Sequence, residues 1–205
     1  MKKITALTLA AALACTAAPV LAQSQGDFTV GLGIGAVLPK DNNGVLAGGT
    51  VPVDVQEGYS LTITGEYFIR DNLGIELLAA WPFEHDIKSN GTKIGTVKHL
   101  PPTLSLQYHF ANSSPITPFL GAGINYTTFV EDKAVGPLAG NSLSVDDSWG
   151  LALHAGLDYE ISPSGSLRAD VRWIDIESDV KLNGVNIGKV KVDPWVLGVA
   201  YVHKF

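Results

Sequence analysis

The stretch WGLALHAGLDY, from Trp149 to Tyr159, decides the fold because its residues alternate between two chemical types. Every second residue from the tryptophan onward is apolar, which gives the series W-L-L-A-L-Y. The residues between them, G-A-H-G-D, are small, polar or charged. A period of two is what a β-strand imposes on its two faces. We therefore predict a strand with one apolar face, tipped by aromatic rings, and an opposite face that carries His154 and Asp158.

The same alternation occurs in seven other segments of similar length. With the first stretch, the predicted strands are residues 28–34, 59–69, 73–81, 104–110, 116–126, 149–159, 167–173 and 195–205. The connections alternate between short ones, rich in turn residues, and long ones. The short connections are residues 71–72, 111–115 and 162–165, and the long ones are residues 39–57, 84–97, 131–147 and 178–192. An even strand count with short turns at one end is typical of an outer-membrane barrel.

Aromatic residues separate this barrel from its competitor, a water-soluble sandwich, which also alternates. Trp81, Tyr126, Trp149 and Trp195 lie at the long-loop ends of their strands, and Tyr67, Tyr108, Tyr159 and Tyr201 lie near the short turns, on the same faces. A strand of ten steps at about 3.3 Å, tilted by about 40°, rises about 25 Å, the height of a lipid-facing band. We predict an all-β, eight-stranded antiparallel transmembrane β-barrel with short periplasmic turns and long extracellular loops.

The N-terminus has the layout of a secretory signal peptide. Lys2 and Lys3 precede an apolar run, and small residues end at Ala22, so residues 1–22 are expected to be cleaved and residues 23–205 to form a single barrel. Cys15 lies in that leader, which leaves no thiol for disulfides or metal ligation. Removal of the two lysines lowers Lys plus Arg from 14 to 12, against 20 Asp plus Glu. The resulting formal charge of −8 argues against nucleic acid as a partner.

Several stretches in order resemble the OmpW family of small outer-membrane barrels. They are DNLGIELLAAWPFEHDI (71–87), HLPPTLSLQYHF (99–110), GAGINYTTF (121–129), DDSWG (146–150) and VDPWVLG (192–198). The resemblance implies a barrel in the cell outer membrane, surrounded by its lipids, that carries small hydrophobic molecules inward. Some members also serve as bacteriocin receptors. The final Phe205 ends an apolar face, as in strands that the outer-membrane assembly machinery reads, so that machinery is a predicted partner.

The inward-facing residues divide into two groups along the barrel axis. Near the short turns they are mixed acids and bases, which we name the lumen plug: Glu66, Glu76, His109, Asp158, Arg168, Asp170 and Arg172. In a narrow interior such groups must pair or be hydrated. Near the long loops they are apolar and form a candidate ligand-binding set: Leu78, Ala80, Pro82, Pro101, Phe129, Ile174, Ile176 and Val196. Either this set is an apolar funnel above the plug, or both groups merely fill a small barrel.

Four further expectations concern the upper half of the barrel. Pro82, Pro101 and Pro102 disturb ladder hydrogen bonds, so a hydrophobic solute stopped by the plug could leave sideways into the bilayer at this seam. A β-bulge is expected after Trp173.

The apolar segment 45–55 could extend the pocket or pack against other loops, and we favour packing against other loops. Asn90–Gly91 and Asn183–Gly184 predict tight hairpin turns outside the membrane.

We found no motif that predicts a metal site, a cofactor or catalysis. The histidines show no short metal-binding spacing, although His85 and His99 could meet across the second long loop. Ser148 beside Asp146 and Asp147 lacks a positioned histidine base, so a lipid-modifying enzyme is the least favoured alternative and no enzyme is predicted. The leading interpretation is a channel or carrier for small hydrophobic molecules. The main alternative is a structural barrel whose loops bind surface partners.

Overall fold

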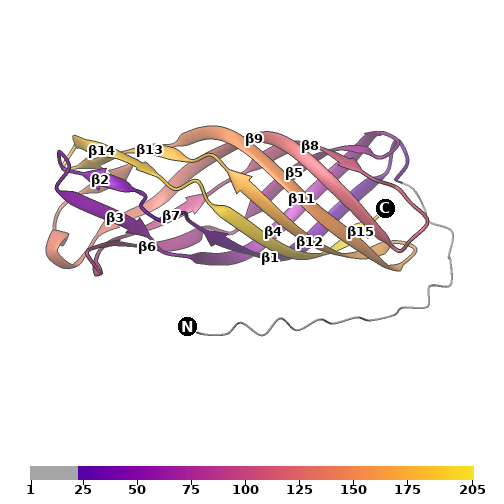
Figure 1. Cartoon of the computed structure of the whole chain (residues 1–205), viewed down its shortest axis with the longest axis horizontal. Helices are drawn as coiled ribbons and strands as arrows, with labels where there is room; N and C mark the ends of the chain where they lie inside the picture. The colour runs from indigo at the N-terminus through magenta and orange to yellow at the C-terminus, as the bar shows by residue number, and fades with distance from the viewer. Residues whose placement is uncertain (1–22) are drawn as a thin grey trace, which may run out of the picture.

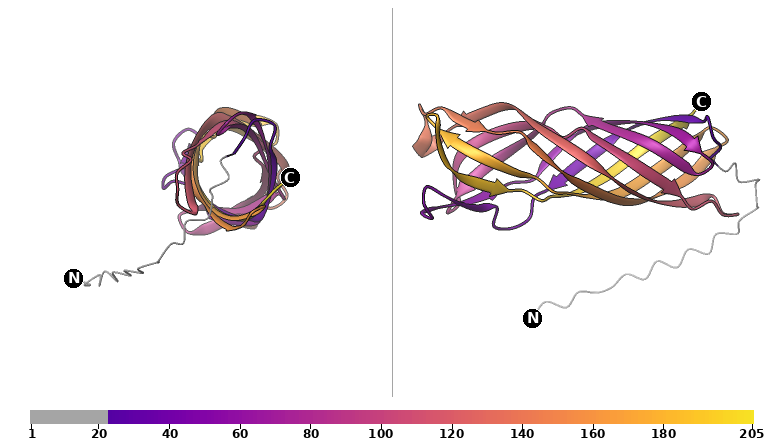
Figure 2. Two further views of the ribbon diagram at one scale, coloured as in Figure 1. Left: turned by 90° about the vertical axis from the view of Figure 1, so that its right-hand side faces the viewer. Right: turned by 90° about the horizontal axis from the view of Figure 1, so that it is seen from above.

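The computed structural model describes residues 23–205, and the predicted signal peptide lies outside the described residues. Eight strands close into an antiparallel ring, seen end-on in Figure 2. In ring order they are β1 (Phe28–Leu38), β4 (Gly58–Arg70), β5 (Leu73–Ala80), β8 (Thr103–His109), β9 (Ile116–Ala134), β11 (Ser148–Ser162), β12 (Gly165–Ile174) and β15 (Trp195–Lys204). The first and last strands pair over their whole length and so remove both sheet edges. The predicted fold class is confirmed.

The barrel wall continues beyond the eight-stranded ring at one end, the left end in Figure 1. This extracellular extension contains β2 (Gly44–Leu46), β3 (Val51–Val55), β6 (Phe83–Ser89), β7 (Thr92–Leu100), the 3-10 turn η1 (Gly136–Leu138), β10 (Leu143–Val145), β13 (Glu177–Leu182) and β14 (Val185–Lys191). Hairpins β6–β7 and β13–β14 turn at Asn90–Gly91 and Asn183–Gly184, where all four residues have positive φ. Asn and Gly tolerate that backbone conformation, which explains why the sequence signal was reliable.

Burial follows the alternation of the sequence and separates a lipid-facing side from a lumen side. On β11, Trp149 and Leu151 are exposed while Ala152, His154 and Asp158 are buried. In a membrane barrel the exposed apolar face meets lipid, and closure of the sheet lets the paired strands satisfy one another's backbone groups. Among residues 23–205 no helix is long and apolar enough to cross a bilayer.

One local expectation was wrong. Arg172, Ile174 and Ile176 are all buried, so even-numbered residues keep facing inward past Trp173. Trp173 itself pairs in register with Trp195, without a bulge. The regular alternation carries the seventh strand upward into β13 with its apolar residues still inside the barrel.

Candidate functional site

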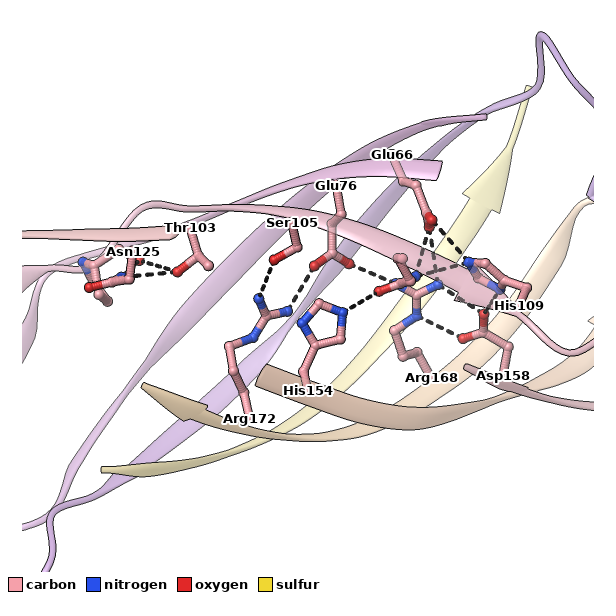
Figure 3. Close-up of polar contacts among 12 residues, drawn as sticks. Glu66, Glu76, Thr103, Ser105, His109, Asn125, His154, Asp158, Arg168 and Arg172 are labelled. Atoms are coloured by element: carbon pink, nitrogen blue, oxygen red, sulfur yellow. Dashed lines mark hydrogen bonds and ion pairs between the residues drawn. The ribbon is translucent and has the colours of Figure 1, made fainter. Parts of the chain in front are cut away.

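The centre of the lumen plug is one carboxylate held between two arginines. The Glu76 carboxylate accepts hydrogen bonds from Arg168 Nη1 at 2.9 Å and from Arg172 Nη2 at 2.8 Å. Arg168 also donates from Nε and Nη2 to the two oxygens of Asp158, at 2.7 and 2.8 Å. All four side chains are buried, and Figure 3 shows them crossing the lumen between opposite walls. Paired donors of this kind give arginine–carboxylate contacts both strength and a fixed geometry.

A second chain of polar contacts adjoins these ion pairs. Glu66 bonds to His109 Nε2 at 2.9 Å and accepts from Gln107 at 3.0 Å, while the Gln107 carbonyl accepts from His154 Nε2 at 2.7 Å. Gln107 and His154 were absent from the predicted plug, although the alternation already turns both inward. Arg168 also stacks over the Phe119 ring, 4.5 Å from its centroid.

Asp170 is the predicted plug residue that stands apart from this network. Within the described residues its carboxylate takes part in no ion pair, and it lies against Gly198 on β15. A Cβ added at Gly198 would collide with that carboxylate. Gly121 has the corresponding role on β9, because a Cβ there would overlap the His154 ring. Small residues therefore provide the room that the polar side chains occupy.

Above the plug, Asn125 hydrogen-bonds to the backbone where two prolines interrupt the strand pairing. Its amide nitrogen donates to the carbonyls of Pro101 and Pro102 and to the Thr103 hydroxyl, at 3.0 to 3.2 Å. The ladder between β5 and β8 ends at the pair Leu78–Thr103. The ladder between the strands that follow, β6 and β7, begins at the pair Phe83–His99. No strand pairing joins residues 79–82 to residues 100–102 in the described wall. The seam predicted from the prolines is thus an interval without ladder hydrogen bonds.

An apolar cluster lies above this level, and five of its members, Leu46, Val53, Val180, Val190 and Val192, also line the cavity described below. Its buried members are Val37, Leu46, Val53, Phe83, Ala152, Ile174, Ile176, Val180, Val190, Val192 and Val196. Three residues of the candidate ligand-binding set, Ile174, Ile176 and Val196, belong to the cluster, and Ala80 packs against it. Leu78, Pro82 and Pro101 are not members of the cluster.

The cavity lies higher, inside the extracellular extension. It has a volume of about 350 Å³, and its wall is built by β2, β3, β6, β7, β9, β10, β13 and β14. Phe129 is the single member of the candidate set that lines it. Segment 45–55, for which we favoured packing against other loops, supplies Leu46, Val51, Val53 and Val55 to the wall, so it does extend the pocket. No Asp, Glu, Lys or Arg among residues 23–205 lines this space.

Two histidines form the main polar feature of the cavity wall. The rings of His85 and His99 are parallel within 2° and stack with centroids 4.8 Å apart. His85 Nδ1 lies 2.6 Å from the Gln56 carbonyl, which can only accept, so this nitrogen carries the proton. Burial lowers the pKa of His85, and burial with the neighbouring His85 lowers the pKa of His99 from 6.5 to about 3. Both rings are therefore neutral near pH 7.

Ser148, considered above as a nucleophile, has a structural role. Its hydroxyl accepts a hydrogen bond from the Glu177 backbone at 3.2 Å. Asp146 is paired with Lys181, and Asp147 accepts from the Tyr126 hydroxyl and the Phe129 backbone. These contacts connect the start of β11 and the two residues before it to β13 and to β9. No described histidine is hydrogen-bonded to Ser148.

A closed membrane barrel with a charged lumen plug and an apolar extracellular cavity defines the class of protein. The OmpW family model matches residues 24–205, and the chain belongs to this family of the cell outer membrane. It is 38% identical over 216 residues to "Outer membrane protein W" of Vibrio cholerae, which covers 99% of this chain and 100% of the relative.

Two further similarities bear on the site. The crystal structure of the outer membrane protein OprG from Pseudomonas aeruginosa superposes with a TM-score of 0.79 at 31% identity, covering 90% of this chain and 98% of that one. The chain is also 26% identical over 204 residues to the "Dibenzothiophene metabolism operon protein PahQ" of Pseudomonas aeruginosa, covering 94% of this chain and 95% of the relative.

Proposed function

We propose that this protein carries small hydrophobic molecules across the outer membrane and that the extracellular cavity is the first binding site. The observation that carries the proposal is the cavity of about 350 Å³, walled by aliphatic and aromatic side chains without a charged group. Ligand pockets are commonly of this size and lining, at the small end of their range. Apolar surface transferred from water into such a space is stabilised in proportion to its area.

The lumen plug would prevent straight passage from the cavity to the periplasm. Arg168 and Arg172 bridge to acids on other strands, and their side chains are buried and hydrogen-bonded. An apolar solute cannot replace those hydrogen bonds, and separating the charges to admit it would leave them buried and unpaired. The solute must therefore leave the bore above Glu76.

The interval of wall between residues 79–82 and 100–102 is the proposed exit into the bilayer. It lacks ladder hydrogen bonds, and Pro101 and Pro102 have no N–H to donate. Opening this interval would break no strand ladder, and the Asn125 contacts to the two proline carbonyls come from β9, on the opposite side of residues 101–103. Lateral release therefore costs less here than at any fully paired seam. The name of PahQ, which refers to an apolar aromatic compound, supports the same class of solute.

A matched pair of substitutions in one hairpin tests the proposal. Val180 on β13 is buried and lines the cavity, whereas Val185 on β14 is exposed at 65%. We expect Val180→Asp to reduce the uptake of N-phenyl-1-naphthylamine by cells about tenfold, because a carboxylate in the cavity disfavours apolar solutes. Val185→Asp should leave uptake unchanged. Equal uptake by both folded variants and the wild type would refute the carrier function.

A further inference from the structure

The cavity contains polar atoms that have no hydrogen-bond partner. The Nε2 atoms of His85 and His99 and the hydroxyl of Ser178 are buried without a partner among the described residues. All three residues line the cavity. Buried polar groups in folded proteins are nearly always hydrogen-bonded, and each exception calls for an explanation. In a binding site, the natural explanation is a group supplied by the ligand.

His99 is the residue best suited to meet such a group. His85 is tethered by its bond to the Gln56 carbonyl, whereas the described residues place no hydrogen bond on the His99 ring. His99 is held only by ring contacts, with His85 at 4.8 Å, Phe83 at 5.7 Å and Phe129 at 5.9 Å between centroids. Rotation about its χ2 angle can therefore turn either ring nitrogen toward the cavity without breaking a hydrogen bond.

The chemistry of the cavity wall limits which polar group a ligand can carry. A carboxylate or an ammonium would be buried without a counter-ion, because no charged residue among residues 23–205 lines the cavity. A chelated metal is disfavoured, since lone pairs that lie in two parallel ring planes do not converge on one ion. A hydroxyl fits, because it can donate to an unprotonated imidazole nitrogen and accept from a protonated one.

We propose that the cavity selects small, uncharged apolar molecules that bear one hydroxyl group, such as phenolic or alcoholic compounds, and that His99 makes the hydrogen bond. This assignment rests on the proposed carrier function and specifies its substrate class. The surrounding rings of Phe129 and His85 would contact the apolar body of the ligand. Ser178, on the hairpin strand β13, is a second polar group on the same wall.

Binding of three matched probes to the full protein in lipid nanodiscs tests the assignment. The probes are naphthalene, 1-naphthol and 1-naphthoate, each measured against empty nanodiscs at pH 7. We expect His99→Phe to keep the ring stack and the affinity for naphthalene but to reduce the preference for 1-naphthol by about three- to tenfold, as for one hydrogen bond. Naphthoate should bind the wild type more weakly than naphthol.

Controls separate this assignment from the carrier function itself. His203→Phe, near the barrel's other end, should leave the preference unchanged, and His99→Met provides a second variant without ring nitrogens should His99→Phe fold poorly. An unchanged preference in folded His99 variants, an equal loss for both neutral probes, a loss seen only in Ser178→Ala, or tightest binding of naphthoate would each overturn the assignment while the carrier function stands. No binding of any probe to the wild type would overturn both.

Discussion

The lumen plug and the extracellular cavity are two interiors of one barrel that differ in charge, because the plug holds ion-paired side chains and no Asp, Glu, Lys or Arg among residues 23–205 lines the cavity. In the plug, Arg168, Asp158 and Glu76 satisfy one another with short hydrogen bonds. In the cavity, His85 and His99 keep nitrogen atoms without hydrogen-bond partners, as the Nδ1 atoms of His109 and His154 do beside the plug's ion pairs. Paired buried charges rigidify a core, whereas an apolar space without charged groups suits an apolar ligand. The comparison supports our proposal that the lower half is closed and that the upper half binds a ligand.

The largest expected effect comes from breaking the plug's charge balance. Arg168→Met keeps the side chain long but leaves Asp158 without its arginine and Glu76 with only one. We expect a loss of about 3–5 kcal/mol in the free energy of unfolding, measured in urea with the protein in lipid vesicles. Arg70→Ala, at an exposed arginine, should change stability little.

A double variant sharpens the interpretation of that loss. If an unpaired buried charge is the cause, adding Asp158→Asn to Arg168→Met should recover part of the stability. Stability equal to that of the single variant would instead indicate that lost packing on Phe119 dominates. Retention of wild-type stability by Arg168→Met itself would show that the plug's ion pairs do not hold the lower bore closed.

A smaller effect is expected from crowding the plug. Gly121→Ala places a methyl group against the His154 ring, which must move and strain its bond to Gln107. Overpacking of this kind costs about 1–3 kcal/mol, measurable in the same urea titration. Gly65→Ala is the matched control, because a Cβ there meets only ordinary contacts with Phe28. Equal stability of both variants would mean that the plug is loosely packed.

The smallest effect should appear in the cavity when the pH falls. Because the pKa of His99 is lowered from 6.5 to about 3, the unfolded segment binds more protons between these values, and stability is lost as the pH drops through that window. The lining offers no carboxylate to offset the charge. At pH 5.5, hydrogen-exchange protection of β6 and β7 should fall roughly tenfold relative to pH 7, after correction for intrinsic rates.

A strand without ionisable side chains supplies the contrast for that measurement, and a variant supplies the control. His99→Phe has no group to protonate at this position, so its β6–β7 hairpin should lose much less protection. Strand β1, which carries no ionisable side chain, should stay protected at both pH values. A uniform loss over the whole barrel would contradict a local origin in the histidine pair.

Prediction from sequence succeeded where a single strand carries the information. Alternation on β11 separates Leu151 and Leu153, facing lipid, from His154 and Asp158, facing the lumen, because the period of two is a local property of the backbone. The Asn90–Gly91 and Asn183–Gly184 turns were readable for the same reason. The position of the apolar cavity could not be predicted, since segment 45–55, two hairpins and the long strand β9 build it together.

The sequence by itself determined the closed wall, its apolar lipid-facing surface and the inward placement of charges, because each depends on residues one or two positions apart along a strand. Only the tertiary structure decided which charges pair, since Glu76 meets Arg168 and Arg172 at separations of 92 and 96 residues. It also decided that Ile174, Ile176 and Val196 pack solidly while the space above them stays hollow. Packing depends on how distant side chains fill one volume, and periodicity along a strand does not record that.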